Sequence, residues 1–368
     1  MIIILTQSFP SRVGGIENLI SNLSLYLSET EKVIVFADQH HIFYDTIYDQ
    51  SIKEKFLVRR VGGIKYFRRR KKIKELKPFL LSNQVKCIIG DTWKSFELCI
   101  DLINLKNIPT ICLTHGNEII NKDQKHFLRI KNTLNKVSSV VCNSEYTKTL
   151  ISKYNLIKPT INTIHPGASN YADIKEKIIP NIEGDPIILT LARLEKRKGH
   201  KEIIYSVKEL LSEFPSLQYI IAGSGSELKN LKKLTSELNL EKNILFVGNI
   251  SDSQKKYLFQ KVNLMVMPTL DETTNRSIEG FGIAYLEASF FSIPSIASNI
   301  GGTPEAVVNN NTGVIIDEIS QLYPTIRDLL SNQVKLKSLG TAAQKRAITE
   351  FTWEVISKKY KSLIKDLY

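Results

Sequence analysis

Short apolar runs alternate with amphipathic segments from the start of the chain. Residues 2–5 are continuously apolar, residues 17–28 carry apolar side chains at helical spacing, and residues 33–36 are apolar again. This pattern predicts a strand, a helix and a second strand. Further elements are predicted at residues 87–89, 110–113 and 139–142 (strands) and 145–154 (helix). The first half of the chain therefore has the pattern of a doubly wound parallel sheet.

A polar, turn-rich stretch at residues 166–186 ends this first series. A second series follows, with strands predicted at residues 187–191, 217–222, 244–246, 264–267 and 295–297 and helices at 200–214 and 227–238. Apolar side chains at helical spacing predict a final helix at residues 353–368. We therefore expect an α/β protein with two doubly wound domains facing a central cleft, 1–168 and 169–352, and a C-terminal helix, 353–368, that returns to the first domain.

Composition narrows the functional class. The 368 residues are 42% hydrophobic and 24% charged, as in ordinary globular domains, and no apolar run reaches the roughly 20 residues that span a bilayer. The opening apolar run lacks the basic flank of a signal peptide. We expect a soluble cytoplasmic protein whose four cysteines, Cys87, Cys99, Cys112 and Cys142, are reduced core residues. The net charge of +13 suits nucleic acid, an anionic membrane surface or a phosphorylated substrate.

Two loops are candidates for binding a diphosphate. Gly14 and Gly15 follow the first predicted strand and open a helix, where backbone amides and the helix dipole favour an anion. A purely structural turn explains the two glycines equally well. In the second half, Arg193 and Lys198 lie five residues apart in a loop after the strand at 187–191, where a guanidinium and an ammonium can clamp a pyrophosphate. A solvated basic loop is the alternative.

The segment 279–288 is the most informative stretch. Gly280 and Gly282 offer amides near a helix start, and Glu279 and Glu287 are eight residues apart. A continuous helix through both would separate them by about 12 Å, which matches the distance between the sugar and the ribose of one nucleotide-sugar. A glycine-rich segment at 301–305 follows it.

Six motifs follow one another along the chain in this order: Gly14 to Glu17, Thr114 to Glu118, Arg193 with Lys198 and Gly199, Ala222 to Gly225, Glu279 to Glu287 and Gly301 to Glu305. Taken together, these motifs resemble the retaining GT-B glycosyltransferases of the glycosyl transferases group 1 family, over essentially the whole chain and in the family's order. Within the family, segments 115–118 and 279–283 resemble the phosphatidylinositol mannosyltransferase and polysaccharide-assembling branch.

The resemblance implies a role for each position. Arg193 and Lys198 would hold the donor diphosphate, Glu279 would contact the transferred sugar, and His115 would lie under that sugar near its anomeric carbon. Glu287 would accept hydrogen bonds from the ribose hydroxyls. The remaining donor-binding positions would be Gly14, Gly15, Gly223, Val247, Gly248, Phe281, Gly282 and Ile283.

Two departures from the family pattern stand out. Val262 and Asn263 replace an acidic residue that usually precedes the strand at 264–267, and we expect this change to affect a structural cap. The following segment, 271–276, is unusually long and polar, and we expect it to alter the sugar pocket. The identity of the donor is therefore left open between GDP-mannose and a UDP-sugar.

A basic segment at residues 65–77 interleaves cations with aromatic and aliphatic side chains. We expect it to rest on anionic lipid headgroups at the inner face of the cell membrane, where each cation contributes about 1 kcal/mol. A solvated basic helix is the alternative. The residues expected on this membrane or acceptor side are Lys65, Arg68, Arg69, Arg70, Lys71 and Lys72.

The predicted function is transfer of a hexose from a nucleotide-sugar to a lipid-linked or polysaccharide acceptor, in the synthesis of O-antigen, capsule or glycolipid. The histidines have no metal-ligand spacing and no Asp-x-Asp motif appears where a metal-dependent transferase needs one, so we expect no cofactor and no catalytic metal. A nucleotide-sugar epimerase of the same fold, which would act without acceptor, and a basic nucleic-acid-binding protein are the alternatives. The sequence leaves the oligomeric state open.

Overall fold

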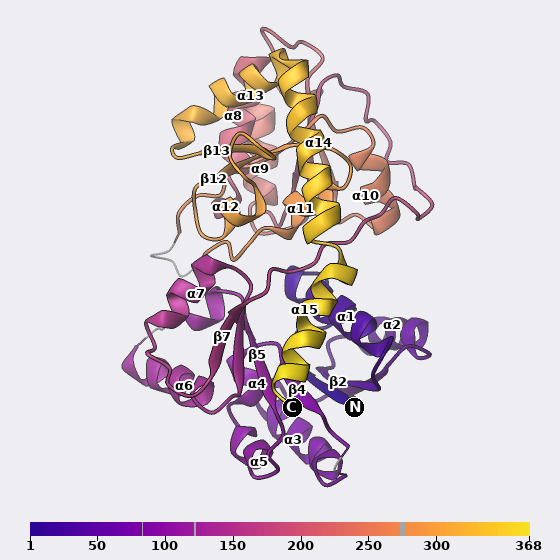
Figure 1. The fold of residues 1–368 in the computed structure, drawn as a ribbon. Helices are drawn as coiled ribbons and strands as arrows, with labels where there is room; N and C mark the ends of the chain where they lie inside the picture. The colour runs from indigo at the N-terminus through magenta and orange to yellow at the C-terminus, as the bar shows by residue number, and fades with distance from the viewer. Residues whose placement is uncertain (83, 121–122, 273–276) are drawn as a thin grey trace. The chain divides into compact units, whose positions relative to one another are not determined.

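The chain folds into two compact units (Figure 1). The computed structural model describes residues 1–82, 84–120, 123–272 and 277–368. The first unit comprises Met1–Gly167 and Trp353–Tyr368, and the second comprises Ala168–Thr352. The division at 167/168 lies one residue from the predicted domain boundary.

The first unit is built on a seven-stranded parallel sheet with the order β3-β2-β1-β4-β5-β6-β7. Its strands are β1 (Ile2–Thr6), β2 (Val33–Asp38), β3 (Leu57–Val61), β4 (Cys87–Gly90), β5 (Thr110–Thr114), β6 (Ser139–Cys142) and β7 (Thr160–Thr163). Its helices are α1 (Gly15–Ser28), α2 (Ile42–Ile52), α3 (Lys65–Leu80), α4 (Trp93–Phe96), α5 (Ile100–Asn104), η1 (Asn117–Ile119), α6 (Gln124–Leu134), α7 (Glu145–Ser152) and α15 (Trp353–Asp366).

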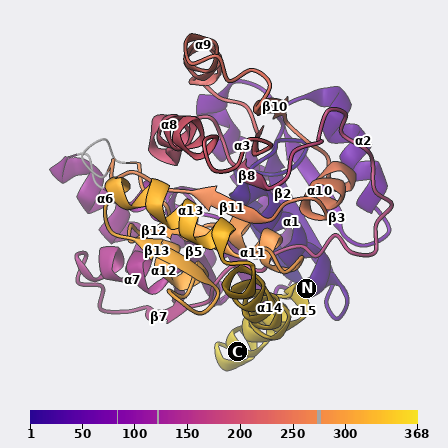
Figure 2. The same ribbon diagram turned by 90° about the horizontal axis from the view of Figure 1, so that it is seen from above.

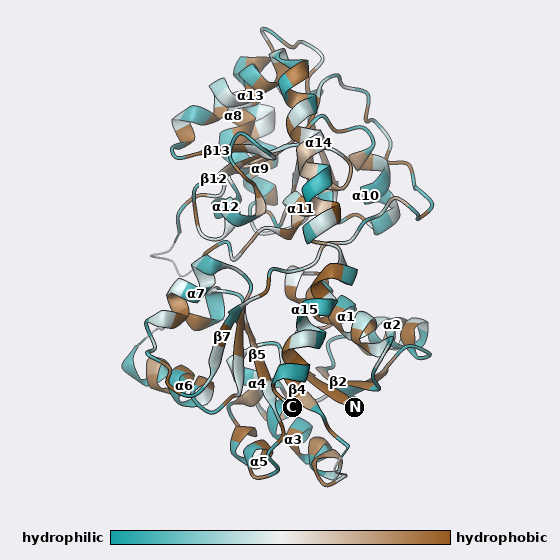
Figure 3. Ribbon diagram, viewed as in Figure 1, coloured by the Kyte–Doolittle hydropathy of each residue, from teal (hydrophilic) through white to brown (hydrophobic). Residues whose placement is uncertain are grey.

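Alternate side chains of the central strands supply two apolar cores, one on each face of this sheet. Ile3 and Leu5 of β1 pack into one core with α3 to α6, while Ile2 and Ile4 pack into the other with α1 and α15. In Figure 3 these central strands are accordingly among the most hydrophobic parts of the unit. The four cysteines are buried and form no disulfide with one another, as expected.

The C-terminal helix α15 packs on α1, which confirms the predicted return to the first unit (Figure 1). The Trp353 ring stacks on Tyr26 with a centroid distance of 6.3 Å, and the Tyr26 hydroxyl donates to Glu354 at 2.8 Å. Ile356 and Tyr360 are buried on the same face. The last residues of the chain therefore complete the core that its first strand begins.

The second unit is built on a six-stranded parallel sheet with the order β10-β9-β8-β11-β12-β13. Its strands are β8 (Ile187–Leu191), β9 (Gln218–Ala222), β10 (Ile244–Gly248), β11 (Leu264–Met267), β12 (Ser295–Ser298) and β13 (Gly313–Ile316). Its helices are η2 (Lys196–Lys198), α8 (His200–Leu210), α9 (Leu228–Glu237), α10 (Asp252–Phe259), α11 (Ile283–Ser289), α12 (Thr303–Ala306), η4 (Ile319–Gln321), α13 (Leu322–Ser331) and α14 (Gln333–Glu350).

Helices cover both faces of this second sheet. Helices α8 and α13 pack side by side over one face, and α11 and α14 pack together over the other (Figure 2). Asn263 ties the start of β11 to β8, since its carbonyl oxygen Oδ1 accepts from the Ile187 amide at 2.7 Å. Two doubly wound parallel sheets are therefore confirmed. Because all strands are parallel, the loops that follow them meet at one edge of each sheet, where ligands of such folds bind.

Candidate active site

A tight turn after β8 directs two basic side chains into the second unit. The 3-10 helix η2 is capped by Gly199, which has a left-handed φ of 69°. A Cβ on Gly199 would come within 2.3 Å of the Pro268 carbonyl oxygen. Only glycine fits this position without strain. The turn places Arg197 and Lys198 in the interior, where they are 5% and 7% exposed.

Lys198 and Arg197 both bind the carboxylate of Glu279. The Lys198 ammonium and an Arg197 guanidinium nitrogen contact the same oxygen, Oε2, the latter at 2.8 Å. Burial raises the pKa of Glu279, but the charges of Lys198 and Arg197 outweigh burial and lower that pKa to about 2. Burial lowers the pKa of Lys198, and Glu279 opposes that shift. The sequence analysis assigned Glu279 and Lys198 to the site but missed Arg197.

Arg193 lies in the same loop, between β8 and η2, and its side chain is exposed. Its guanidinium pairs with Glu195 at 2.7 Å, and Glu195 also contacts Arg197 at 3.3 Å. The charge of Arg193 is close enough to lower the pKa of Lys198 further, after burial and Arg197. Three cations and two carboxylates thus share this sheet edge, which leaves an excess positive charge available to an anion.

Gly282 is the N-cap of helix α11, which starts at Ile283, so Glu279 lies outside that helix. Gly282 has a φ of 101°, and a Cβ there would meet the Tyr285 ring at 2.6 Å. The helical rise of about 12 Å between Glu279 and Glu287 that the sequence suggested is therefore wrong, because the left-handed glycine interrupts the helix. Phe281 is buried, and Ile283 is the first helical residue. Glu287, on α11, is buried beside Tyr171 and Lys255.

The glycine motifs bring backbone segments into close contact. A Cβ at Gly223 would lie 1.9 Å from the Ala192 carbonyl oxygen, and the Gly223 amide donates to Gly248 at 2.7 Å. A Cβ at Gly301 would lie 2.2 Å from the Glu279 carbonyl oxygen. Val247 and Gly248 end strand β10 and belong to the same sheet edge. These glycines therefore shape the loops that hold Glu279 and the segment at Arg193.

His200 is a buried base directly behind this cluster. Its ring bonds to the Tyr219 hydroxyl at 3.2 Å and to the Arg193 carbonyl at 3.4 Å. Burial lowers the pKa of His200 from 6.5 to about 4. The unfolded chain therefore takes up a proton at a higher pH than the folded chain does.

Acid is consequently expected to destabilise the second unit through His200. The stability contributed by neutral His200 is complete above pH 6.5 and is lost as the pH falls towards 4, with a cost of up to about 3 kcal/mol. Urea unfolding from pH 7 to 4 should show this loss in the wild type and a flatter profile in His200→Gln. His41→Gln, at an exposed position, serves as the control, and equal slopes for all three proteins would contradict the assignment.

In the first unit, Gly14 and Gly15 begin helix α1. Gly14 is extended, with a φ of 172°, and a Cβ there would come within 2.3 Å of the Glu17 carboxylate. Glu17 is buried and pairs with Arg12 at 3.4 Å. The preceding Ser11 donates its amide and hydroxyl to Asp45, the hydroxyl at 2.7 Å. The loop is thus held at both ends.

His115 follows β5 and is anchored by a second residue that the sequence analysis missed. Its Nε2 donates to the Asp91 carbonyl at 2.8 Å, and its amide donates to Glu118 at 2.7 Å. The Asp91 carboxylate is buried and accepts from Thr6 and from the Gln7 amide, both at 2.8 Å. In the sequence, the position of Asp91 just after the predicted strand at 87–89 could have marked it as a site residue. Asp91 therefore joins the ends of β1, β4 and β5.

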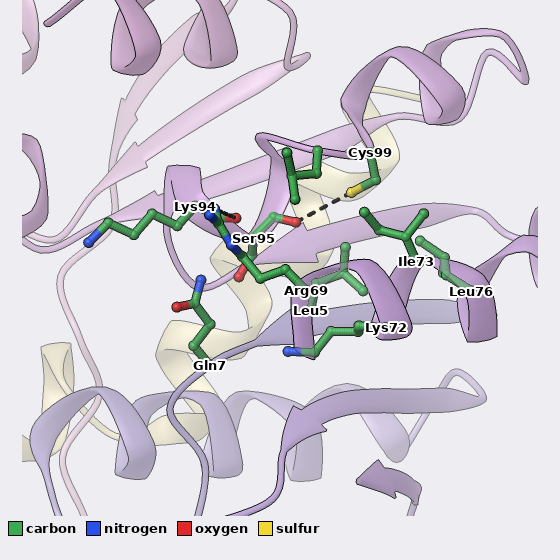
Figure 4. Close-up of a pocket in the computed structure, with 10 residues that line it drawn as sticks. Leu5, Gln7, Arg69, Lys72, Ile73, Leu76, Lys94, Ser95 and Cys99 are labelled. Atoms are coloured by element: carbon green, nitrogen blue, oxygen red, sulfur yellow. Dashed lines mark hydrogen bonds between the residues drawn. The ribbon is translucent and has the colours of Figure 1, made fainter. Parts of the chain in front are cut away.

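Helix α3 carries the basic segment, and it divides the predicted membrane-facing residues into two groups. Lys72 is buried and binds Asp38 at 2.8 Å, and Arg69 binds Glu97 at 2.6 Å. Figure 4 shows both side chains lining a small pocket between α3 and the α4 region. Lys72 therefore does not face a membrane, because its ammonium is buried and paired with Asp38 inside the unit. Lys65, Arg70 and Lys71 are exposed, while Arg68 is half-buried and bonds to the Gly63 carbonyl.

Within the residues that the structure describes, no three metal-binding side chains gather closely enough to hold an ion. None of the described helices combines the length and the apolar character that crossing a bilayer requires. Of the polar segment 271–276, residues 273–276 lie outside the described part of the chain.

Two family models match successive parts of the chain. The model described as Glycosyltransferase Family 4 matches residues 13–169, and the model described as Glycosyl transferases group 1 matches residues 172–346. Among solved structures, HepE of Anabaena in complex with UDP and glucose superimposes with a TM-score of 0.80 at 17% identity, covering 100% of both chains. This likeness concerns the fold.

Curated relatives give a similar result. A GDP-mannose-dependent alpha-(1-6)-phosphatidylinositol monomannoside mannosyltransferase of Mycolicibacterium smegmatis is 27% identical over 49% of this chain and 47% of its own length. The chain thus spans about half the length of the first curated relatives it matches. A GDP-mannose-dependent monoacylated alpha-(1-6)-phosphatidylinositol monomannoside mannosyltransferase of Corynebacterium glutamicum is 21% identical over 98% of this chain and 97% of its own. Because these two glycosyltransferase models match successive parts of the chain, this GT-B chain belongs to the glycosyl transferases group 1 family.

Proposed function

We propose that the protein is a retaining, metal-independent hexosyltransferase that moves a sugar from GDP-mannose or a UDP-sugar to a lipid-linked or polysaccharide acceptor in cell-surface glycan synthesis. The observation that carries this proposal is the cluster of Lys198, Arg197 and Glu279 at the carboxyl edge of the second sheet, with Arg193 beside it. Cations of this kind suit a diphosphate, and a buried ionised carboxylate suits sugar hydroxyls. The match to mannosyltransferases supports GDP-mannose, and the fold shared with a UDP-binding protein supports UDP.

In the proposed reaction, the bond between the anomeric carbon and the diphosphate oxygen breaks through an oxocarbenium-like transition state. The acceptor oxygen then bonds to the same face of that carbon, and its proton passes to the departing phosphate oxygen. Arg193, Lys198 and the amides of segment 281–283 stabilise the negative charge that develops on the diphosphate. Preorganised donors of this type supply much of an enzyme's rate enhancement.

Two carboxylates take binding roles rather than acid and base roles. Glu279 keeps its charge, because its pKa is lowered to about 2, and so accepts hydrogen bonds from the transferred sugar. Glu287 accepts from the ribose hydroxyls, while Gly223, Val247 and Gly248 border the nucleotide. In the first unit we propose that His115, anchored on Asp91, contacts the donor sugar and that Gly14 and Gly15 contact the diphosphate.

Thermal-shift measurements with UDP-, GDP-, ADP- and CMP-sugars, with and without magnesium, test this proposal. A ligand that binds only the folded state raises the midpoint temperature of unfolding. At a ligand concentration about 100 times its dissociation constant, the gain in stability is about 2.7 kcal/mol. We expect one nucleotide class to give this shift without magnesium. No shift with any of them would overturn the donor site, and turnover of the donor to an isomer in the absence of acceptor would identify an epimerase instead.

The exposed part of α3 supports a peripheral site at the cytoplasmic membrane face. Lys65, Arg70 and Lys71 accompany Ile64 and Tyr66, whose side chains are 72% and 71% exposed. Exposed cations beside exposed apolar side chains suit the headgroup region of an anionic bilayer. Partial burial of Arg68 and Arg69 means that they contribute less to such a surface.

We expect the triple substitution of Lys65, Arg70 and Lys71 by glutamine to lower the affinity for vesicles containing phosphatidylglycerol by roughly 100-fold, since each cation contributes about 1 kcal/mol of binding free energy. Co-sedimentation of the protein with the vesicles measures this affinity. The control replaces three exposed lysines elsewhere in the first unit, Lys53, Lys55 and Lys106. Equal binding by both triple variants would contradict a specific role for α3.

A further inference from the structure

Glu287 is held by two residues from other parts of the second unit. Tyr171 lies at the start of the unit, is 4% exposed, and donates its hydroxyl to Glu287 Oε1. Lys255 projects from α10, and its ammonium lies 3.2 Å from the same oxygen and 2.8 Å from the Tyr171 hydroxyl oxygen. Both partners therefore converge on one oxygen of the carboxylate.

The direction of each hydrogen bond follows from the protonation states. Burial raises the pKa of Tyr171, and the charge of Glu287 raises it further, so the phenol keeps its proton. Burial lowers the pKa of Lys255, but Glu287 and Asp252 outweigh it and leave that pKa raised. The ammonium thus donates to the Tyr171 oxygen and to Glu287, and the phenol donates its single proton to Glu287.

Packing keeps these donors in place. The Lys255 ammonium lies 4.8 Å from the centre of the Tyr171 ring, and that ring also stacks on Phe259 with a centroid distance of 6.4 Å. Asp252 holds Lys255 at 3.4 Å, and Ser251 and Gln254 close a capping box at the start of α10. The donors are thus supplied by a fixed helix and a fixed aromatic ring.

We propose that Tyr171 and Lys255 are positioning residues that occupy Oε1 of Glu287 and so present Oε2 to the ribose of the donor nucleotide. This inference rests on the proposed function, because it requires a nucleotide at Glu287. A carboxylate oxygen with a fixed direction can accept from a ribose hydroxyl, and a site built to bond a hydroxyl strongly rejects an analogue that lacks it. The pair therefore sets a preference for ribonucleotides over deoxyribonucleotides.

Isothermal titration calorimetry with UDP, 2′-deoxy-UDP, GDP, 2′-deoxy-GDP and the two 3′-deoxy analogues tests this proposal. The wild type should prefer one ribonucleotide to its deoxy analogues by about 10-fold or more. Tyr171→Phe, which keeps the ring, and Lys255→Met should each lose about 10-fold in ribonucleotide affinity and little in deoxynucleotide affinity. Lys256→Met is the matched control, because Lys256 lies on the same helix and bonds the Ala172 and Ile174 carbonyls without contacting Glu287.

Each outcome decides the matter. A reduced preference in Tyr171→Phe or Lys255→Met, with the control unchanged, supports the positioning role. An equal loss for ribonucleotides and deoxynucleotides, or a wild type that binds both equally, overturns it while leaving the donor site intact. Binding of neither UDP nor GDP by the folded wild type overturns the proposed function itself. If Tyr171→Phe unfolds, Lys255→Met alone carries the comparison.

Discussion

Lys198→Met is expected to lower kcat/KM for the nucleotide-sugar by about 100- to 1,000-fold, the effect of removing one preorganised donor to a developing anion. Lys198 is 7% exposed, and its ammonium is held in place by the carboxylate of Glu279. Because the cation is already desolvated, little reorganisation is needed when the diphosphate departs. Initial-rate measurements at saturating acceptor provide the test.

Methionine is the appropriate replacement because the Lys198 ammonium lies 3.6 Å from the Met267 sulfur, so an unbranched apolar chain fits the space. Arg193→Ala is expected to reduce turnover as well, with no change in stability, since Arg193 is exposed. Lys196→Met, at an exposed position of the same loop, is the control. Full activity in both the Lys198 and the Arg193 variants would remove the diphosphate assignment.

Most strands predicted from the sequence are those whose side chains are buried on both faces, and the edge strand β10, which is mostly half-buried, is the exception. All residues of β1 and β9 are buried, and such strands read as continuous apolar runs. Strands β3, β7 and β13 were missed, and all three lie at sheet edges. In β3 and β7 most side chains are exposed or half-buried, as in Arg59 and Arg60 of β3, so no apolar run marks them.

The site was predictable where a motif fixes a residue and was missed where only the fold brings residues together. Lys198 and Glu279 belong to recognisable motifs and do meet, at Oε2 of the carboxylate. Arg197 looks like one more cation in a basic loop until the turn at Gly199 buries it. Tyr171 and Lys255 are 84 residues apart and reach Glu287 only through the packing of α10. Sequence spacing carries no information on such contacts.

Glu279 is expected to stabilise the fold as well as to bind the donor, because its carboxylate contacts the two buried cations Lys198 and Arg197. Glu279→Gln leaves the buried Lys198 charge without a counter-ion and leaves Arg197 with Glu195 as its only acidic partner among the ion pairs of this cluster. Removing one partner of a buried ion pair typically costs about 3–5 kcal/mol. We therefore expect Glu279→Gln to lower the free energy of unfolding by about that amount, measured by urea unfolding at pH 7.

The pH dependence of the same variant has a defined sign. The folded pKa of Glu279, about 2, lies below its ordinary value of 4.5, so its contribution is present above pH 4.5 and is lost as the pH falls towards 2. The stability difference between wild type and Glu279→Gln should therefore shrink in that window. Glu237→Gln, which removes an exposed i,i+4 pair with Lys233, should cost less than about 0.5 kcal/mol and serves as the control.

A double variant tests whether Glu279 stabilises the protein as the counter-ion of Lys198. Lys198→Met combined with Glu279→Gln removes one buried cation together with the carboxylate, so the double variant should be more stable than the sum of the two single effects predicts. Arg197 then remains as a single buried cation beside Glu195, which still pairs with it at 3.3 Å. If the effects of the two substitutions on the free energy of unfolding simply add, Glu279 stabilises the loop through its own packing and not as the counter-ion of Lys198.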